Sequence, residues 1–179
     1  ESGFKDALTG IYLKLGTKTL YAGDLTYAYL DELAGLYSDY PGYNTNAVFD
    51  QSIVFDYENM FLSKKNGIYS TMYNIIANIN NFLEYVDKNK DVLVTERYYE
   101  TMKGEALGLR AFLHFDLLRM FGPIYKEHPA SKAIPYRTTF DKDATPVLSA
   151  NEVVDAILKD LNAAEKLLKE SDPLHFFTD

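Results

Sequence analysis

One run of residues, from position 95 to 121, constrains the fold of this chain more than any other feature of its sequence. Its apolar side chains recur at steps of three and four residues, which is the period of an α-helix. The stripe consists of Met102, Ala106, Leu109, Leu113, Leu117 and Met120. A run of this length with one continuous apolar face predicts a long helix that packs in the interior of a domain.

A row of small residues lies on the opposite face of this predicted helix. It runs from Gly104 through Gly108 and Ala111 to Phe115. Each interior Gly costs about 1 kcal/mol of helix propensity relative to Ala, and close approach of a neighbouring helix would offset that cost. The row therefore predicts a helix that is buried nearly all round, and a Gly-Pro pair after position 121 ends it.

Four further segments carry a helical pattern. They cover residues 4–16, 24–38, 63–87 and 149–170. Asp24 is the expected N-cap of the second segment. Ser149 and Glu152 form a capping box at the start of the last.

Two long segments, 39–62 and 123–148, break the helical period with prolines and other turn formers. We therefore expect an all-α fold of about five helices joined by long irregular loops, without a strand.

The composition bounds the class of protein. With 179 residues, 47% of them hydrophobic, the chain is long enough for one domain, which we place over 1–179. The formal charge of -8 disfavours nucleic acid as a partner, because phosphate binding depends on Lys and Arg. There is no cysteine and no apolar run long enough to cross a membrane. Both ends look cut, so we expect a fragment of a longer protein.

Several polar residues in the helical segments invite a catalytic interpretation. Glu105 and Arg110 lie five residues apart on different helix faces, which is poor geometry for a pair. Arg110 shares a face with His114, and we expect its guanidinium to bond to carbonyls or a carboxylate of an adjacent helix. Asn80 is either a ligand contact or, as we favour, an inter-helix hydrogen bond. We predict no catalytic residue, no metal site and no cofactor.

The segment from Tyr37 to Tyr57 is the strongest candidate for ligand binding. Flat sugar faces stack on aromatic rings, and amide side chains bond to pairs of hydroxyls. The candidate ligand contacts are Tyr40, Tyr43, Asn44, Asn46 and Tyr57. The alternative is that these aromatic rings pack into the core.

Three segments carry distinctive residue patterns. In the first, Tyr69, Tyr73, Ile76 and Asn80 follow one another at steps of four, three and four. The second, and the most specific, runs from Lys103 to Pro123 and carries Gly104-Glu105-Ala106, Leu109-Arg110-Ala111, Phe115 and Phe121-Gly122. The third is Ile134-Pro135-Tyr136 followed by Ser149 to Val153 and Asp160-Leu161. In this order and at these separations, the three segments resemble the N-terminal region of the SusD/RagB family of nutrient-binding outer-membrane lipoproteins.

The resemblance departs from the family pattern in two respects, of which the first is that members of the family are far longer than this chain. The second is that Tyr69 stands where many members carry Trp, and this chain has no Trp. A sugar platform that other members build on Trp must therefore use Tyr here or lie outside this chain.

The resemblance implies antiparallel, tetratricopeptide-like helix pairs whose loops bind an oligosaccharide or polysaccharide. It also implies a surface-exposed protein of the outer membrane, lipid-anchored in full length, that partners a SusC-like TonB-dependent porin and does not cleave the glycan. The rival hypothesis is a helical-repeat scaffold that binds protein rather than sugar.

Overall fold

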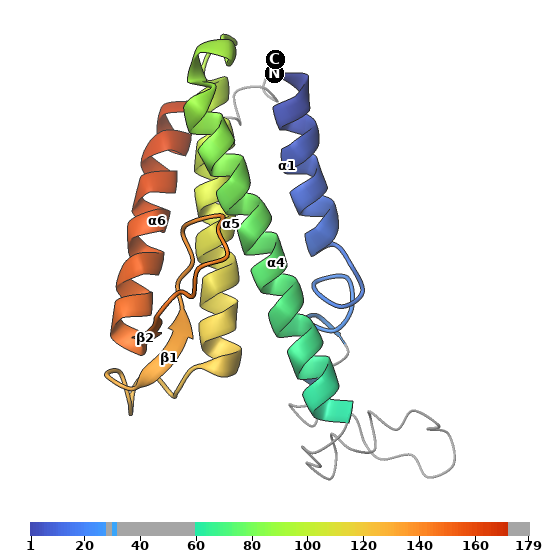
Figure 1. The fold of residues 1–179 in the computed structure, drawn as a ribbon, viewed down its shortest axis with the longest axis vertical. Coiled ribbons are helices and arrows are strands. Elements are labelled where there is room, and N and C mark those ends of the chain that lie inside the picture. The colour runs from blue at the N-terminus through green and yellow to red at the C-terminus, as the bar shows by residue number, and fades with distance from the viewer. Residues whose placement is uncertain (28–29, 32–59, 172–179) are drawn as a thin grey trace. The chain divides into compact units, whose positions relative to one another are not determined.

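The computed structural model describes residues 1–27, 30–31 and 60–171. In those ranges it contains four α-helices, a short 3-10 helix (Lys90–Val92) and one two-stranded ribbon (Figure 1). The helices are α1 (Ser2–Leu15), α4 (Met60–Lys88), α5 (Tyr98–Phe121) and α6 (Ala150–Ser171). The predicted all-α class is thereby confirmed, and these helices match the predicted segments 4–16, 63–87, 95–121 and 149–170.

The chain divides into two compact units. The first comprises Glu1–Ile11 and Asn74–Asp179, and the second comprises Tyr12–Tyr73. Helices α1 and α4 each contribute to both. None of the described helices has the length and apolarity needed to cross a membrane.

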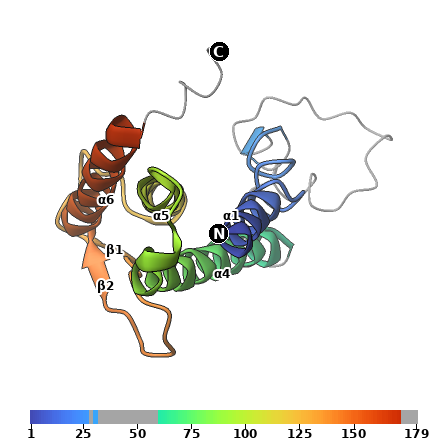
Figure 2. The same cartoon turned by 90° about the horizontal axis from the view of Figure 1, so that it is seen from above.

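In the first unit, α5 and α6 lie side by side and antiparallel (Figures 1 and 2). A Cβ built on Gly104 would come within 2.8 Å of Leu168 Cγ, and one built on Gly108 within 3.9 Å of Ala164 Cβ. The missing side chain of Gly104 is therefore what lets α6 approach. The expectation that the glycine row receives a neighbouring helix is confirmed.

Helix α5 is less enclosed than its sequence predicts. Its apolar stripe is buried at Met102, Ala106, Leu113 and Leu117, but Phe115 is 46% exposed. Helix α6 covers the Gly104 end of the row. The prediction of burial nearly all round is wrong at Phe115 and also at Phe112, which is 43% exposed.

The start of α6 follows the predicted capping box. The Glu152 carboxylate accepts the Ser149 amide proton at 2.7 Å, and the Ser149 hydroxyl accepts the Glu152 amide proton at 3.4 Å. These bonds satisfy two amides that the first turn of a helix leaves without partners.

The predicted start of α5 is wrong by three residues. Residues 95–97 form a turn, Arg97 adopts a left-handed conformation with φ of 61°, and the helix begins at Tyr98. The amide and the hydroxyl of Thr95 both donate to the Glu1 carboxylate at 2.7 Å. Thr95 is thus held against the chain's first residue instead of entering the helix.

The segment 123–148 is not wholly irregular. Strands β1 (Lys132–Pro135) and β2 (Val147–Ser149) pair antiparallel, with Lys132 opposite Ser149 and Pro135 opposite Val147. The expectation of no strand is therefore wrong. A two-stranded ribbon consists of edge strands, and an edge strand tolerates proline.

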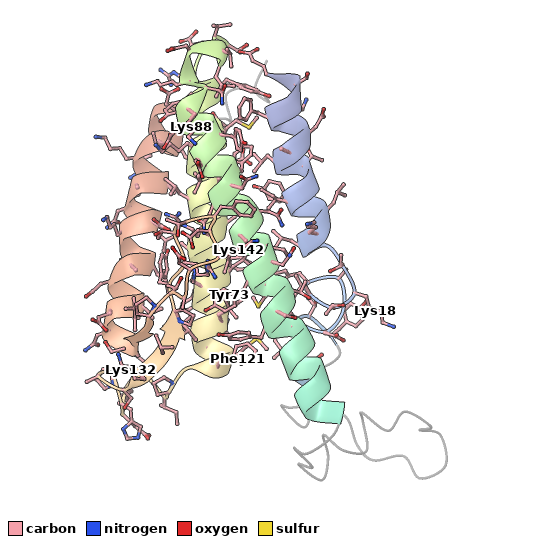
Figure 3. The ribbon with its side chains drawn as sticks, in the orientation of Figure 1. Lys18, Tyr73, Lys88, Phe121, Lys132 and Lys142 are labelled. Atoms are coloured by element: carbon pink, nitrogen blue, oxygen red, sulfur yellow. The ribbon has the colours of Figure 1, made fainter. Side chains whose placement is uncertain are left out.

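The connection between the two strands returns to the helices. In Figure 3, Lys132 marks the start of β1, and Lys142 lies in the connection between the strands. This connection extends from the ribbon to about the middle of the helices. The segment thereby reaches α4 and α5.

In the second unit, residues 16–27 form a series of turns. The Asp24 amide donates to the Lys18 carbonyl at 2.9 Å, and Leu20 beside it is fully buried. Gly23 sits so close to the Lys18 carbonyl that a side chain there would clash. The predicted helix start at Asp24 is therefore wrong, residues 30–31 are helical, and residues 28–29 and 32–38 lie outside the described residues.

We predict opposite effects for alanine at the two glycines of α5. G108A should raise the free energy of unfolding by up to about 1 kcal/mol, because the helix gains propensity without a clash. G104A should lower it by about 1 kcal/mol or more, because Leu168 must shift. Urea unfolding followed by circular dichroism measures both, and equal effects of the two changes would contradict the proposed close contact.

Candidate functional site

The candidate ligand contacts predicted from the sequence, Tyr40, Tyr43, Asn44, Asn46 and Tyr57, lie outside the described residues. They stay a prediction. The described part of the chain brings a different set of residues together, and most of them belong to the segments that carry the family resemblance.

A buried pair of charges joins α5 to α6. Arg110 donates from Nε to Asp160 Oδ2 at 2.7 Å and from Nη2 to Oδ1 at 2.8 Å. Both side chains are about nine-tenths buried. Burial alone would lower the pKa of Arg110, but the bonds to Asp160 outweigh it and raise that pKa. The expectation that Arg110 bonds to a neighbouring helix is confirmed, with Asp160 as its partner.

Asn80 extends this pair to α4. Its Oδ1 accepts from Arg110 Nη1 at 2.9 Å, and its Nδ2 donates to the carbonyls of Arg137 and Thr139 at 3.1 and 3.2 Å. Asn80 is 2% exposed. The predicted inter-helix hydrogen bond is confirmed, and one amide group also holds the 137–139 backbone against α4.

Tyr136 completes the bonding of Asp160. Its hydroxyl donates to Asp160 Oδ2 at 2.6 Å, and its ring stacks on His114 with centroids 3.9 Å apart. Burial and the Asp160 carboxylate both raise the pKa of Tyr136. We call Asn80, Arg110, His114, Tyr136 and Asp160 the polar cluster.

The two ring nitrogens of His114 have different roles. Nδ1 lies 2.8 Å from the Arg110 carbonyl, which only accepts, so Nδ1 carries the proton. Nε2 accepts the Arg137 amide proton at 3.1 Å. The neutral ring is therefore the form that fits, and burial lowers the pKa of His114 from 6.5 to about 4. This arrangement serves structure, since both ring nitrogens of a fully buried side chain are occupied.

The other residues of the resemblance lie on the same helices. Tyr69 and Tyr73 are half-buried on α4 with ring centroids 4.7 Å apart. Glu105 is half-buried on α5 and lies outside the Arg110–Asp160 pair. Gly122 follows the end of α5 and donates its amide to the Leu118 carbonyl at 2.9 Å.

Beside the polar cluster lies a cleft of about 550 Å³, formed by α4, α5 and residues 138–141. Its lining combines two leucines, one aromatic ring and several polar side chains, and Asn80 and Arg110 form part of its wall. The lining residues are Asn80, Leu83, Glu84, Asp87, Lys103, Leu107, Arg110, Thr138, Thr139, Phe140 and Asp141. Sequence analysis missed this cleft, because the path of 138–141 depends on bonds from Asn80 that no local pattern shows.

The fold and the polar cluster define the class of protein: an array of helices in which buried polar side chains bind the loop that follows β1. The particular family follows from comparison with known proteins. A model of a SusD-like family, described as starch-binding and associating with the outer membrane, matches residues 16–178. The match spans nearly the whole chain, so this chain belongs to that SusD-like family of outer-membrane-associated proteins.

Individual proteins are also similar to this chain, and two of them illustrate the relationship. SusD-like protein P38 of Formosa agariphila is 44% identical over 75 residues, which is 40% of this chain and 13% of that protein. The crystal structure of a SusD superfamily protein from Bacteroides thetaiotaomicron superposes with a TM-score of 0.70 at 19% identity. It covers 93% of this chain and 37% of its own length, so the two share a fold and this chain spans about a third of the larger protein.

Removing the buried carboxylate should be far more costly than removing an exposed one. We expect Asp160→Ala to lower the free energy of unfolding by about 3–5 kcal/mol, because the Arg110 guanidinium stays buried without its partner. The matched control is Asp155→Ala on the exposed side of α6, which should change it by less than about 0.5 kcal/mol. Urea unfolding measures both, and equal losses would contradict the proposed role of the pair.

Acid should weaken the fold through His114. The unfolded chain takes up the proton near pH 6.5 and the folded chain only near pH 4. The contribution of His114 is therefore zero above pH 6.5, and the free energy of unfolding falls by about 3 kcal/mol in total between pH 6.5 and 4. His114→Gln should remove this part of the pH dependence in urea unfolding, and identical pH profiles for the variant and the wild type would contradict it.

Proposed function

We propose that this chain is the helical part of a non-catalytic glycan-capture protein. In full length it is lipid-anchored at the cell surface, binds an oligosaccharide or polysaccharide and passes it to a SusC-like TonB-dependent porin. The observation that carries the proposal is the match of residues 16–178 to a family described as starch-binding and associating with the outer membrane.

Capture without cleavage agrees with the chemistry of the polar cluster. A glycosidase needs two carboxyl groups that face the scissile bond. Both carboxylate oxygens of Asp160 instead accept hydrogen bonds from Arg110 and Tyr136, and the residue is 8% exposed. Arg110 and Asp160 thus hold the fold and are not available to a substrate.

The contacts to the glycan are proposed to come first from the 40–57 segment. Its Tyr40, Tyr43 and Tyr57 rings suit the C–H faces of sugars, and the Asn44 and Asn46 amides suit hydroxyl pairs. Aromatic rings provide a large contact area at low cost in conformational entropy. This composition is typical of a sugar platform.

The test is affinity gel electrophoresis of the full-length protein against a panel of polysaccharides. We expect at least one polysaccharide to retard the wild-type protein. The triple change Tyr40→Ala, Tyr43→Ala and Tyr57→Ala should weaken that retardation at least about tenfold in Kd, because stacking on each ring is lost. The matched control is Tyr125→Ala, an exposed tyrosine of the described structure, which should leave retardation unchanged.

Two outcomes would overturn the proposal. Absence of retardation on every polysaccharide, combined with tight binding to a porin, would favour the protein-binding scaffold. Release of reducing sugar by the purified protein would favour an enzyme.

A further inference from the structure

We infer that the cleft formed by α4, α5 and residues 138–141 is a second sugar-binding site, which takes one neutral pyranose unit of an oligosaccharide. The inference rests on the proposed function for the class of ligand. It differs in the residues that carry it, since none of the cleft residues belongs to the 40–57 segment.

Hydrogen bonds hold the wall of the cleft that residues 138–141 form. Asn80 bonds to the carbonyls of Arg137 and Thr139, and Arg137 Nη2 donates to the Asp141 carbonyl at 2.8 Å. The Thr139 hydroxyl bonds to the Asp141 carboxylate and lowers the pKa of that group. A wall that is already ordered loses little entropy when a ligand binds.

This wall carries an exposed aromatic ring. Phe140 lines the cleft and is 54% exposed, although its neighbours on either side are anchored. A singly exposed aromatic ring is common on protein surfaces, so what distinguishes Phe140 is its place in the lining of a cleft. Aromatic rings stack on the C–H faces of sugars, and Leu83 and Leu107 add apolar surface to the same lining.

Helices α4 and α5 supply hydrogen-bond donors and acceptors to the cleft. Lys103 Nζ donates to Asp87 Oδ1 at 2.7 Å and to the Tyr99 hydroxyl at 3.0 Å. An ammonium group has three protons, so within the described part of the chain one direction is left for a ligand hydroxyl. The Asp87 carboxylate is half exposed and accepts hydrogen bonds beside it.

Charge and size favour a neutral polyhydroxylated ligand. Each lining carboxylate has a cationic partner: Glu84 pairs with Lys88, Asp87 with Lys103 and Asp141 with Arg137, so little of the charge in the lining is uncompensated. The Arg110 charge is already matched by Asp160. A volume of about 550 Å³ lies within the usual range for small-molecule sites and holds a pyranose with room for the next unit.

The first arm of the test uses the full-length protein in gels with the polysaccharide that retards it most. We expect Phe140→Ala to weaken retardation about three- to tenfold in Kd, and Phe140→Trp to restore it. Lys103→Met should weaken it as well. The matched control is Phe115→Ala, a phenylalanine of similar exposure that does not line the cleft, which should have no effect.

The second arm isolates the cleft from the 40–57 segment. Saturation-transfer NMR is run on the Tyr40→Ala, Tyr43→Ala and Tyr57→Ala protein with the methyl glycosides of glucose, galactose, mannose and xylose. We expect transfer to at least one of them and its loss when Phe140→Ala is added. Circular dichroism confirms that each variant is folded.

The outcomes separate the two proposals. Retardation that is unchanged by Phe140→Ala and Lys103→Met, but lost in the triple tyrosine variant, would overturn the cleft site and leave glycan capture standing. Transfer that depends on Phe140, in a protein that no polysaccharide retards, would support the cleft site and overturn polysaccharide capture. Absence of both signals would overturn both.

Discussion

The two hydrogen bonds between the Arg110 guanidinium and the Asp160 carboxylate are the constraint on which the rest of the first unit depends. Burying two charges is costly unless further hydrogen bonds accompany the pair. Tyr136 donates one to Asp160 and Asn80 accepts one from Arg110, so the segment after β1 and helix α4 are both bonded to the pair. A pair that would be weak at the surface therefore specifies how α4, α5, α6 and the segment after β1 meet. The bonds require α6 to lie close to α5, which Gly104 permits.

The polar cluster also explains how a chain of helices acquires a candidate binding surface. Loops usually run over the surface and carry function, provided that a rigid scaffold positions them. Here the carbonyls of Arg137 and Thr139 bond to Asn80, and the Arg137 amide bonds to His114, so residues 137–139 are fixed from α4 and α5. Phe140 follows directly and stays exposed. The same buried residues thus stabilise the fold and shape the cleft.

Much of the fold could be predicted from the sequence, because helix periodicity and capping are local signals. They locate the four described helices, and the capping box of Ser149 and Glu152 locates the start of α6. The type of partner for Arg110 followed from the cost of an unpaired buried charge. Its identity did not, since Asp160 lies 50 residues away and no local pattern links the two. The β ribbon and the cleft could not be predicted either, because both depend on contacts between residues that no local pattern links. The proposed ligand contacts of the 40–57 segment stay a prediction.

The polar cluster holds the segment after β1 against the helices, and the hydrogen-exchange rate of the Arg137 amide, whose proton is donated to His114 Nε2, tests this directly. We expect this amide to exchange as slowly as amides in the middle of α5. Asn80→Ala should accelerate its exchange at least about a hundredfold while α5 stays protected. If the Arg137 amide of the wild-type protein exchanges as fast as an exposed loop amide, the polar cluster does not hold this segment.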